Sequence, residues 1–256
     1  MELKVLGCHG SETPKHRTTS FLVDDKLAID AGALTSALSL DEQRKIESVL
    51  VSHSHLDHVR DLSTIADNRC QQGGPTLEIV GTPATLAALQ AHFFNGKMWP
   101  DFSKIDTPCG PTVRYRAIEP EKVSEVSGLK VTPVLVSHTI ETAAFVIEGS
   151  DGGSLAFSGD TGPTERFWEV LNELPDLRSL LMEVSFPNDQ SELATASGHH
   201  TPGTLETELQ KLDAKDGLPI LLYHIKPVFY TQVTKQLAKI KKQDLHILQL
   251  GDQFLF

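Results

Sequence analysis

Short apolar runs, separated by polar residues, Gly and Pro, recur along the whole chain. Runs rich in Val, Ile and Leu predict strands, and longer stretches with apolar residues on one side predict helices. The predicted strands cover residues 3–6, 19–24, 27–29, 47–52, 77–81, 112–118, 129–136, 143–148, 154–157, 179–184, 219–223, 246–250 and 254–256. The predicted helices cover residues 40–46, 61–68, 83–91, 164–174, 203–212 and 228–242. Strands and helices alternate through the middle of the chain, which is typical of a layered α/β fold.

Turn and cap residues refine this pattern at a few points. The first three predicted strands can form an antiparallel meander, because Asp25 and Lys26 supply a tight turn between the second and the third. Thr82 and Pro83 fit the N-cap and the first position of the helix that follows them. The aromatic-rich residues 93–102 fit either a satellite of the core or a wall over a binding site.

The length and composition predict a folded chain with a hydrophobic core. With 256 residues and 39% hydrophobic content, the chain can form one large α/β domain or two small ones. The net charge of -11 is spread along the sequence without a basic block, so long nucleic acids are not expected as partners. The N-terminal residues do not resemble a signal peptide, and no window has the length of a membrane span. We therefore expect no membrane association.

Cysteine usage points to a reducing compartment. The three cysteines, Cys8, Cys70 and Cys109, are an odd number and include no C-x-x-C pair. This spacing indicates neither a disulfide framework nor a thiolate zinc site. We expect a cytoplasmic protein.

The strongest chemical signal is the stretch H-S-H-L-D-H at residues 53–58. It follows a predicted buried strand, so His53 and His55 can point to the same side of extended backbone. Asp57 and His58 begin the next turn and face elsewhere. Imidazole and carboxylate groups suit Zn²⁺ and similar ions. Because one ion cannot use all four groups and stay open to substrate, the spacing favours two neighbouring metal ions.

Other candidate ligands also follow predicted apolar strands. They are His138, Asp160 and His224. Each alone would favour a structural role, but sites in α/β folds assemble at strand ends, so the set predicts one shared site. Asp30 also follows a strand, where it can either cap the next segment or contribute a carboxylate to the site.

The order of these residues resembles that of the metallo-β-lactamase superfamily from Leu3 to the C-terminus. The resemblance implies an αβ/βα sandwich, with two mixed β-sheets face to face and helices on the outer faces, as a single hydrolase domain over residues 1–256. It implies that Asp30 supports the metal loop from behind the ligands. It implies a first metal on His53, His55 and His138, a second on Asp57, His58 and His224, and Asp160 as the bridging carboxylate.

Five shorter motifs resemble class II cyclic-nucleotide phosphodiesterases within that superfamily: H-S-H-L-D-H at 53–58, W-P-D-F at 99–102, E-V-S-F at 183–186, G-H-H-T-P at 198–202 and H-I-K-P at 224–227. The doubled histidine departs from the expected single His. Alignment on Gly198 assigns the catalytic role to His199, with His200 as the alternative. The same loop also fits a helix start, with Thr201 as the capping residue. His200, Thr201 and Lys226 are further candidate substrate contacts, although Lys226 also fits a solvent-facing position.

This resemblance implies hydrolysis of a 3′,5′-cyclic nucleotide (cAMP or cGMP) to the nucleoside 5′-monophosphate. Two divalent ions would be needed, with Zn²⁺ expected and Mn²⁺ and Fe²⁺ as alternatives. The competing enzymes are a tRNA 3′-processing nuclease and a lactone or thioester hydrolase, and a non-catalytic binding protein is the competing class. The preferred base and the oligomeric state, including a homodimer, stay open.

Overall fold

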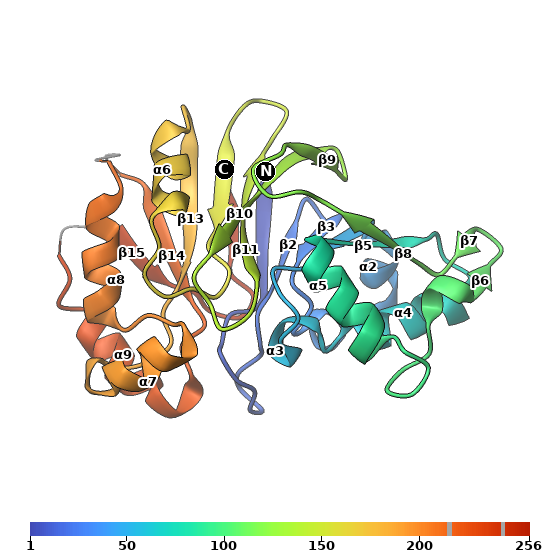
Figure 1. Ribbon diagram of the computed structural model, residues 1–256, viewed down its shortest axis with the longest axis horizontal. Helices are drawn as coiled ribbons and strands as arrows, with labels where there is room; N and C mark the ends of the chain where they lie inside the picture. The colour runs from blue at the N-terminus through green and yellow to red at the C-terminus, as the bar shows by residue number, and fades with distance from the viewer. Residues whose placement is uncertain (214–216, 242–243) are drawn as a thin grey trace.

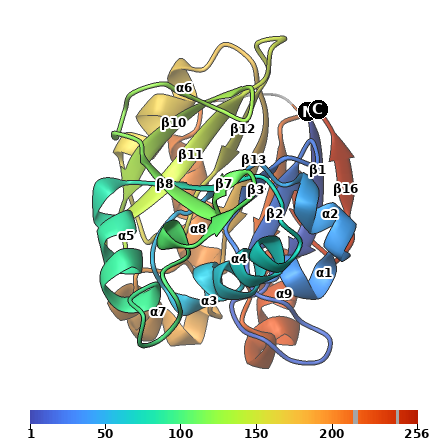
Figure 2. The same cartoon turned by 90° about the vertical axis from the view of Figure 1, so that its right-hand side faces the viewer.

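The computed structural model describes residues 1–213, 217–241 and 244–256. Two seven-stranded mixed sheets face each other, and helices cover their outer faces (Figure 1). The predicted αβ/βα sandwich is therefore confirmed. The two termini lie side by side (Figure 2), and the amino group of Met1 donates to the carbonyl of Phe256 at 2.9 Å.

The first sheet has the strand order β16-β1-β2-β3-β4-β5-β8. Its strands are β1 (Glu2–Gly7), β2 (Ser20–Val23), β3 (Leu27–Ile29), β4 (Ser48–Leu50), β5 (Leu77–Gly81), β8 (Val113–Ala117) and β16 (Gln253–Leu255). The strands from β16 to β3 pair antiparallel, as the predicted meander requires, and those from β3 to β8 pair parallel. Its helices are α1 (Leu34–Ala37), α2 (Leu40–Lys45), α3 (Leu56–Val59), α4 (Leu62–Gln71) and α5 (Pro83–Ala88).

The second sheet has the strand order β15-β14-β13-β12-β11-β10-β9. Its strands are β9 (Ser124–Val126), β10 (Leu129–Val136), β11 (Thr142–Glu148), β12 (Ser154–Phe157), β13 (Leu177–Glu183), β14 (Pro219–Tyr223) and β15 (Asp244–Ile247). Pairing changes from antiparallel to parallel at β12. Its helices are α6 (Arg166–Glu173), α7 (Ser191–Ser197), α8 (Pro202–Glu208) and α9 (Tyr230–Leu237).

The central core lies between the sheets and contains stacked aromatic rings. Phe157 packs against Phe21 of the opposite sheet at a centroid distance of 5.8 Å and against Tyr223 at 5.2 Å. Two further buried clusters join the outer face of each sheet to its helices. Because apolar side chains anchor both faces of both sheets, the strand ends are held in fixed positions, and polar residues that follow the strands can be positioned accurately.

Most predicted elements are confirmed to within a few residues, and five of them have the predicted bounds: β3, β5, β10, β12 and β14. The predicted helix over 228–242 is wrong in extent: a 3₁₀ turn occupies Pro227–Phe229 and α9 ends at Leu237, while Lys242 lies outside the described residues. The helix after Pro83 changes into a π-helix over Leu89–Phe93. Helices α1 and α7 and strand β9 were not predicted, because elements this short carry little periodicity.

A membrane-spanning helix is absent from the described ranges, since none of their helices is both long and apolar enough.

Candidate metal centre

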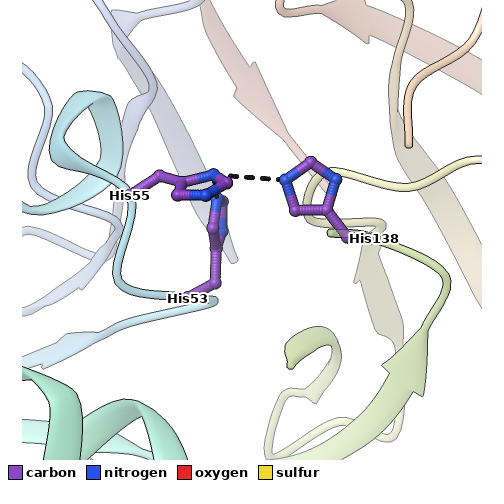
Figure 3. A group of neighbouring side chains, drawn as sticks. All are labelled: His53, His55 and His138. Carbon is purple, nitrogen blue, oxygen red and sulfur yellow. Dashed lines mark hydrogen bonds between the residues drawn. The ribbon is translucent and has the colours of Figure 1, made fainter. Parts of the chain in front are cut away.

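Three histidines from two separate loops point toward one another (Figure 3). His53 and His55 follow β4, and His138 follows β10. The ring nitrogens Nε2 of His53 and Nδ1 of His55 are 3.0 Å apart, and Nε2 of His138 lies 3.2 Å from the same Nδ1. One nitrogen from each ring lies within 4.8 Å of the others, which is the spacing of ligands around a single ion.

A second group of four side chains adjoins the first: Asp57, His58, Asp160 and His224, whose donor atoms also lie within 4.8 Å of one another. Oδ2 of Asp160 is 3.1 Å from Nε2 of His58 and 3.3 Å from Nε2 of His224. The same oxygen is 3.8 Å from Nε2 of His53, a member of the first group. Asp160 therefore lies where the two groups meet.

These residues fit a pair of divalent cations by their chemistry. The carboxyl oxygen Oδ1 of Asp160 is buried and has no partner among the described residues, which is costly unless something binds there. Burial would raise the pKa of Asp160, but His224 and His58 outweigh it and hold that pKa well below its usual range. Burial lowers the pKa of His53, so this ring stays neutral, as a ligand must.

The ligand histidines are also oriented from behind. The ring nitrogen that faces away from the centre has a partner in each of four cases: His53 with Ser52 at 3.0 Å, His58 with Asp30 at 2.7 Å, His138 with the Gly198 carbonyl at 2.9 Å, and His224 with Ser185 at 2.8 Å. Such contacts fix the tautomer and the ring orientation of metal-binding histidines. This arrangement is typical of a prepared metal site.

Asp30, which follows β3, contacts Ser52 and His58 in the segment that follows β4. The residue has a left-handed backbone with φ of 57° and is wholly buried. Its carboxylate accepts from the backbone N–H and the hydroxyl of Ser52, both at 2.8 Å, in addition to His58. The alternative role as a helix cap does not apply, because α1 has Ala33 at its N-cap and no side-chain cap. His224 has a left-handed backbone as well, with φ of 69°.

The doubled histidines lie in different surroundings. His199 stacks on the ring of His224 at 5.1 Å, lies 5.1 Å from the ring of His138, and has its Nδ1 3.1 Å from Glu183. His200 is fully buried, with its Nδ1 3.2 Å from the Thr204 hydroxyl. His199 therefore adjoins the ligands, whereas His200 packs at the start of α8.

Glu183 was not singled out by the sequence reasoning, although the motif at 183–186 contains it. It ends β13 fully buried, and it accepts from the backbone N–H of His200 at 3.1 Å and the hydroxyl of Ser185 at 3.0 Å. Burial raises its pKa to about 7. The available signal was a lone Glu at the end of an apolar run, where an unpaired carboxylate is costly.

The remaining candidate residues make local contacts. Thr201 caps α8 in a reciprocal capping box with Thr204, and Pro202 takes the first helical position. Lys226 donates to the carbonyl of Gly10 at 3.2 Å and lies over the ring of Phe186. In the aromatic-rich segment, the Trp99 indole donates to the carbonyl of Ser63 at 3.1 Å, so this segment packs on α4.

Comparison with known proteins gives a consistent family. The family model "Beta-lactamase superfamily domain" matches residues 23–225. A probable 3′,5′-cyclic-nucleotide phosphodiesterase of Yersinia pestis is 27% identical, covering 98% of this chain and 84% of its own. A ribonuclease Z of Bacillus licheniformis is 26% identical and covers 88% of each chain. The crystal structure of unliganded yeast PDE1 matches with a TM-score of 0.80 and 20% identity over 95% of both chains, which supports the fold alone.

Proposed function

This chain belongs to the β-lactamase superfamily, and we propose that it is a dinuclear-metal phosphodiesterase that hydrolyses 3′,5′-cyclic nucleotides to nucleoside 5′-monophosphates. The observation that carries the proposal is the meeting of two ligand groups at Asp160, with the imidazole of His199 beside them. The near-full-length similarity to cyclic-nucleotide phosphodiesterases supports this substrate class over other substrates of metal-dependent hydrolases.

In the proposed site each group of side chains holds one divalent cation. His53, His55 and His138 would hold the first, Asp57, His58 and His224 the second, and Asp160 would bridge them. Two bound cations, which we propose to be Zn²⁺, would supply positive charge at the phosphate and would activate water for attack on phosphorus. The four supporting contacts from Ser52, Asp30, Gly198 and Ser185 keep the rings in place during turnover.

His199 is the proposed proton donor to the departing 3′ oxygen. Its Nδ1 faces Glu183, which leaves Nε2 as the nitrogen available to a substrate. Burial lowers the pKa of His199, and the negative charge of Asp160 partly counteracts this by stabilising the protonated form. Glu183 would orient the ring through its contact with Nδ1. His200, bound to Thr204 and away from the ligands, has no such role in this proposal.

The competing readings differ in their expected substrates. The similarity to ribonuclease Z supports an RNA-processing alternative, but a net charge of -11 is unfavourable for binding a long polyanion. Lactone and thioester hydrolysis need the same ligands and are separated only by assay. A non-catalytic binding role is disfavoured because all seven candidate ligand side chains are present and grouped. We also propose a free cyclic nucleotide as partner, and no long nucleic acid or membrane.

The test is a substrate panel on metal-analysed protein. Cyclic AMP, cyclic GMP, a linear phosphodiester, a lactone, a thioester and a pre-tRNA are compared at equal enzyme concentration. We expect turnover of cyclic nucleotides to exceed cleavage of pre-tRNA by a wide margin. Robust 3′ cleavage of RNA without cyclic-nucleotide turnover would favour the nuclease, and turnover of only the lactone or thioester would reject phosphodiester chemistry.

A further inference from the structure

A cavity of about 370 Å³ opens beside the second ligand group. It lies between the loop that follows β1 and the N-terminal end of α3, and the residues that matter for its chemistry are Gly10, Ser11, Glu12, Leu56, Asp57 and Arg60. Asp57 both lines this cavity and belongs to the second ligand group, so the cavity borders the metal centre. The volume falls in the range of small-molecule sites.

The wall formed by the loop after β1 is tied to the metal centre. Gly10 donates to the carbonyl of Ile225 at 3.3 Å and accepts from Lys226. A Cβ atom on Gly10 would lie 2.5 Å from the carbonyl oxygen of His224 and 2.8 Å from its Nδ1, so the loop backbone is packed directly on this candidate ligand. The tip is closed by mutual backbone hydrogen bonds between Thr13 and His16, both at 3.1 Å. These contacts hold the backbone of the loop, and therefore this wall of the cavity, in a fixed position.

The electrostatics of the cavity favour hydrogen-bond donors over anions. Arg60, its cation, is engaged by the protein: Nε donates to Asp61 at 2.9 Å, Nη2 donates to the Gly32 carbonyl at 2.6 Å, and Nη1 pairs with Oε2 of Glu12. The other carboxylate oxygen of Glu12 has no recorded partner within the described part of the chain, and the side chain is 45% exposed. The cavity therefore offers a positioned carboxylate acceptor, which suits N–H groups and repels phosphate.

The cavity also offers one apolar surface. Leu56 lies between the candidate ligands His55 and Asp57, and it is 62% exposed. Its side chain can cover one face of a flat aromatic ring, which would remove apolar surface of both partners from water. A ligand that combines an aromatic ring with N–H donors matches both walls.

We infer that this cavity receives the base of the substrate, an amino-substituted purine, whose exocyclic amino group donates to Glu12 while Leu56 packs on the ring. This inference rests on the proposed function, since the phosphate of the same molecule would be held at the metal centre. Arg60 acts as a positioning residue: it holds one oxygen of Glu12 and leaves the other for the base. Glu12 can accept from the amino group at C6 of adenine or, with the base turned, from that at C2 of guanine, whereas a purine without an amino group offers no such donor. Leu56 packs on any purine ring.

Binding of products by calorimetry tests this inference independently of turnover. Dissociation constants are measured on zinc-loaded protein for AMP, GMP, purine riboside 5′-monophosphate, which lacks the amino group, and ribose 5-phosphate, which lacks the base. We expect AMP and GMP to bind about tenfold more tightly than purine riboside 5′-monophosphate, the effect of one hydrogen bond to a charged group. Ribose 5-phosphate should bind more weakly still.

Two variants assign the difference to the cavity. Glu12→Ala should reduce the tenfold preference for AMP to about twofold or less, and Leu56→Ala should weaken both purine nucleotides about threefold without affecting ribose 5-phosphate. The matched control is Glu47→Ala, which removes an exposed glutamate paired with Lys26 at 3.1 Å, away from the cavity. Zinc content is measured in every variant.

The outcomes separate this inference from the proposed function. Equal binding of AMP and purine riboside 5′-monophosphate, no detectable binding of AMP, or an unchanged preference in Glu12→Ala would each overturn the assignment of the cavity. If the preference and its loss in Glu12→Ala are observed but no cyclic nucleotide is hydrolysed, the base site stands and the proposed reaction is rejected.

Discussion

Replacement of His199 is the most informative perturbation of the proposed reaction. His199 is not one of the seven proposed ligands, although its ring also groups with His138 and Asp160, and its side-chain polar contacts are with Glu183 and Ser185. Because the seven proposed ligands stay in place, we expect His199→Ala to retain both metals and the fold. A positioned proton donor contributes about 10²–10⁴-fold to turnover, or about 3–5 kcal/mol in the activation barrier. We expect a loss of this size in the hydrolysis of cyclic AMP.

The doubled histidine supplies a matched control. His200 is wholly buried and its Nδ1 contacts Thr204, so His200→Ala removes packing without touching the ligands. Loss of a buried side chain of this size costs about 2–4 kcal/mol of stability. We therefore expect His200→Ala to unfold at a lower temperature than His199→Ala but to retain far more activity at 25 °C.

The assay compares two leaving groups in both variants. A p-nitrophenyl phosphodiester needs little protonation, so the loss in His199→Ala should be at least about tenfold smaller on it than on cyclic AMP. Equal losses on the two substrates would assign His199 to phosphate binding instead. An active His199→Ala together with a folded but inactive His200→Ala would refute the reasoning, because the residue that faces the site would then be the wrong one.

Three further predictions concern the metals, their support and the thiols. Elemental analysis of fresh protein should find about two divalent ions per chain, and Asp160→Ala should reduce both because the carboxylate lies where the groups meet; one ion or none in the wild-type protein contradicts the dinuclear site. Asp30→Ala leaves three buried donors on Ser52 and His58 without an acceptor, at a cost of about 1–3 kcal/mol each, so thermal unfolding and zinc titration should show a protein that is less stable by several kcal/mol and binds zinc weakly. Asp30→Asn should have a milder effect, because Asn tolerates the left-handed backbone at this position. Equal behaviour of the two variants would argue against this role of Asp30. Burial raises the pKa of the Cys8 thiol to about 12, so a disulfide reagent at pH 8 should modify the exposed Cys109 and spare Cys8 until urea is added; prompt labelling of Cys8 in the native protein would disagree with its burial.

The family and the general position of the site were accessible from the sequence because their signals are local. Six consecutive residues from His53 to His58 contain four metal-ligating side chains, and alternating apolar runs predicted most strands that lead to the site. The predicted superfamily is confirmed by the family match over residues 23–225. Thr201 and Pro202 predicted the start of α8, since helix capping depends on a few neighbouring residues.

The contacts that give the site its geometry depended on tertiary structure. Asp57 and His224 are 167 positions apart in the chain, and nothing near either residue determines that they meet. The pairing order of the strands decides it, because the buried faces of both sheets must match before their ends come together. The same packing decides which of two adjacent histidines faces the ligands: Glu183, at the end of β13, accepts from the Nδ1 of one and the backbone of the other. Local sequence could therefore supply the ligand types, whereas their distances, their supporting contacts and the cavity at Glu12 required long-range packing.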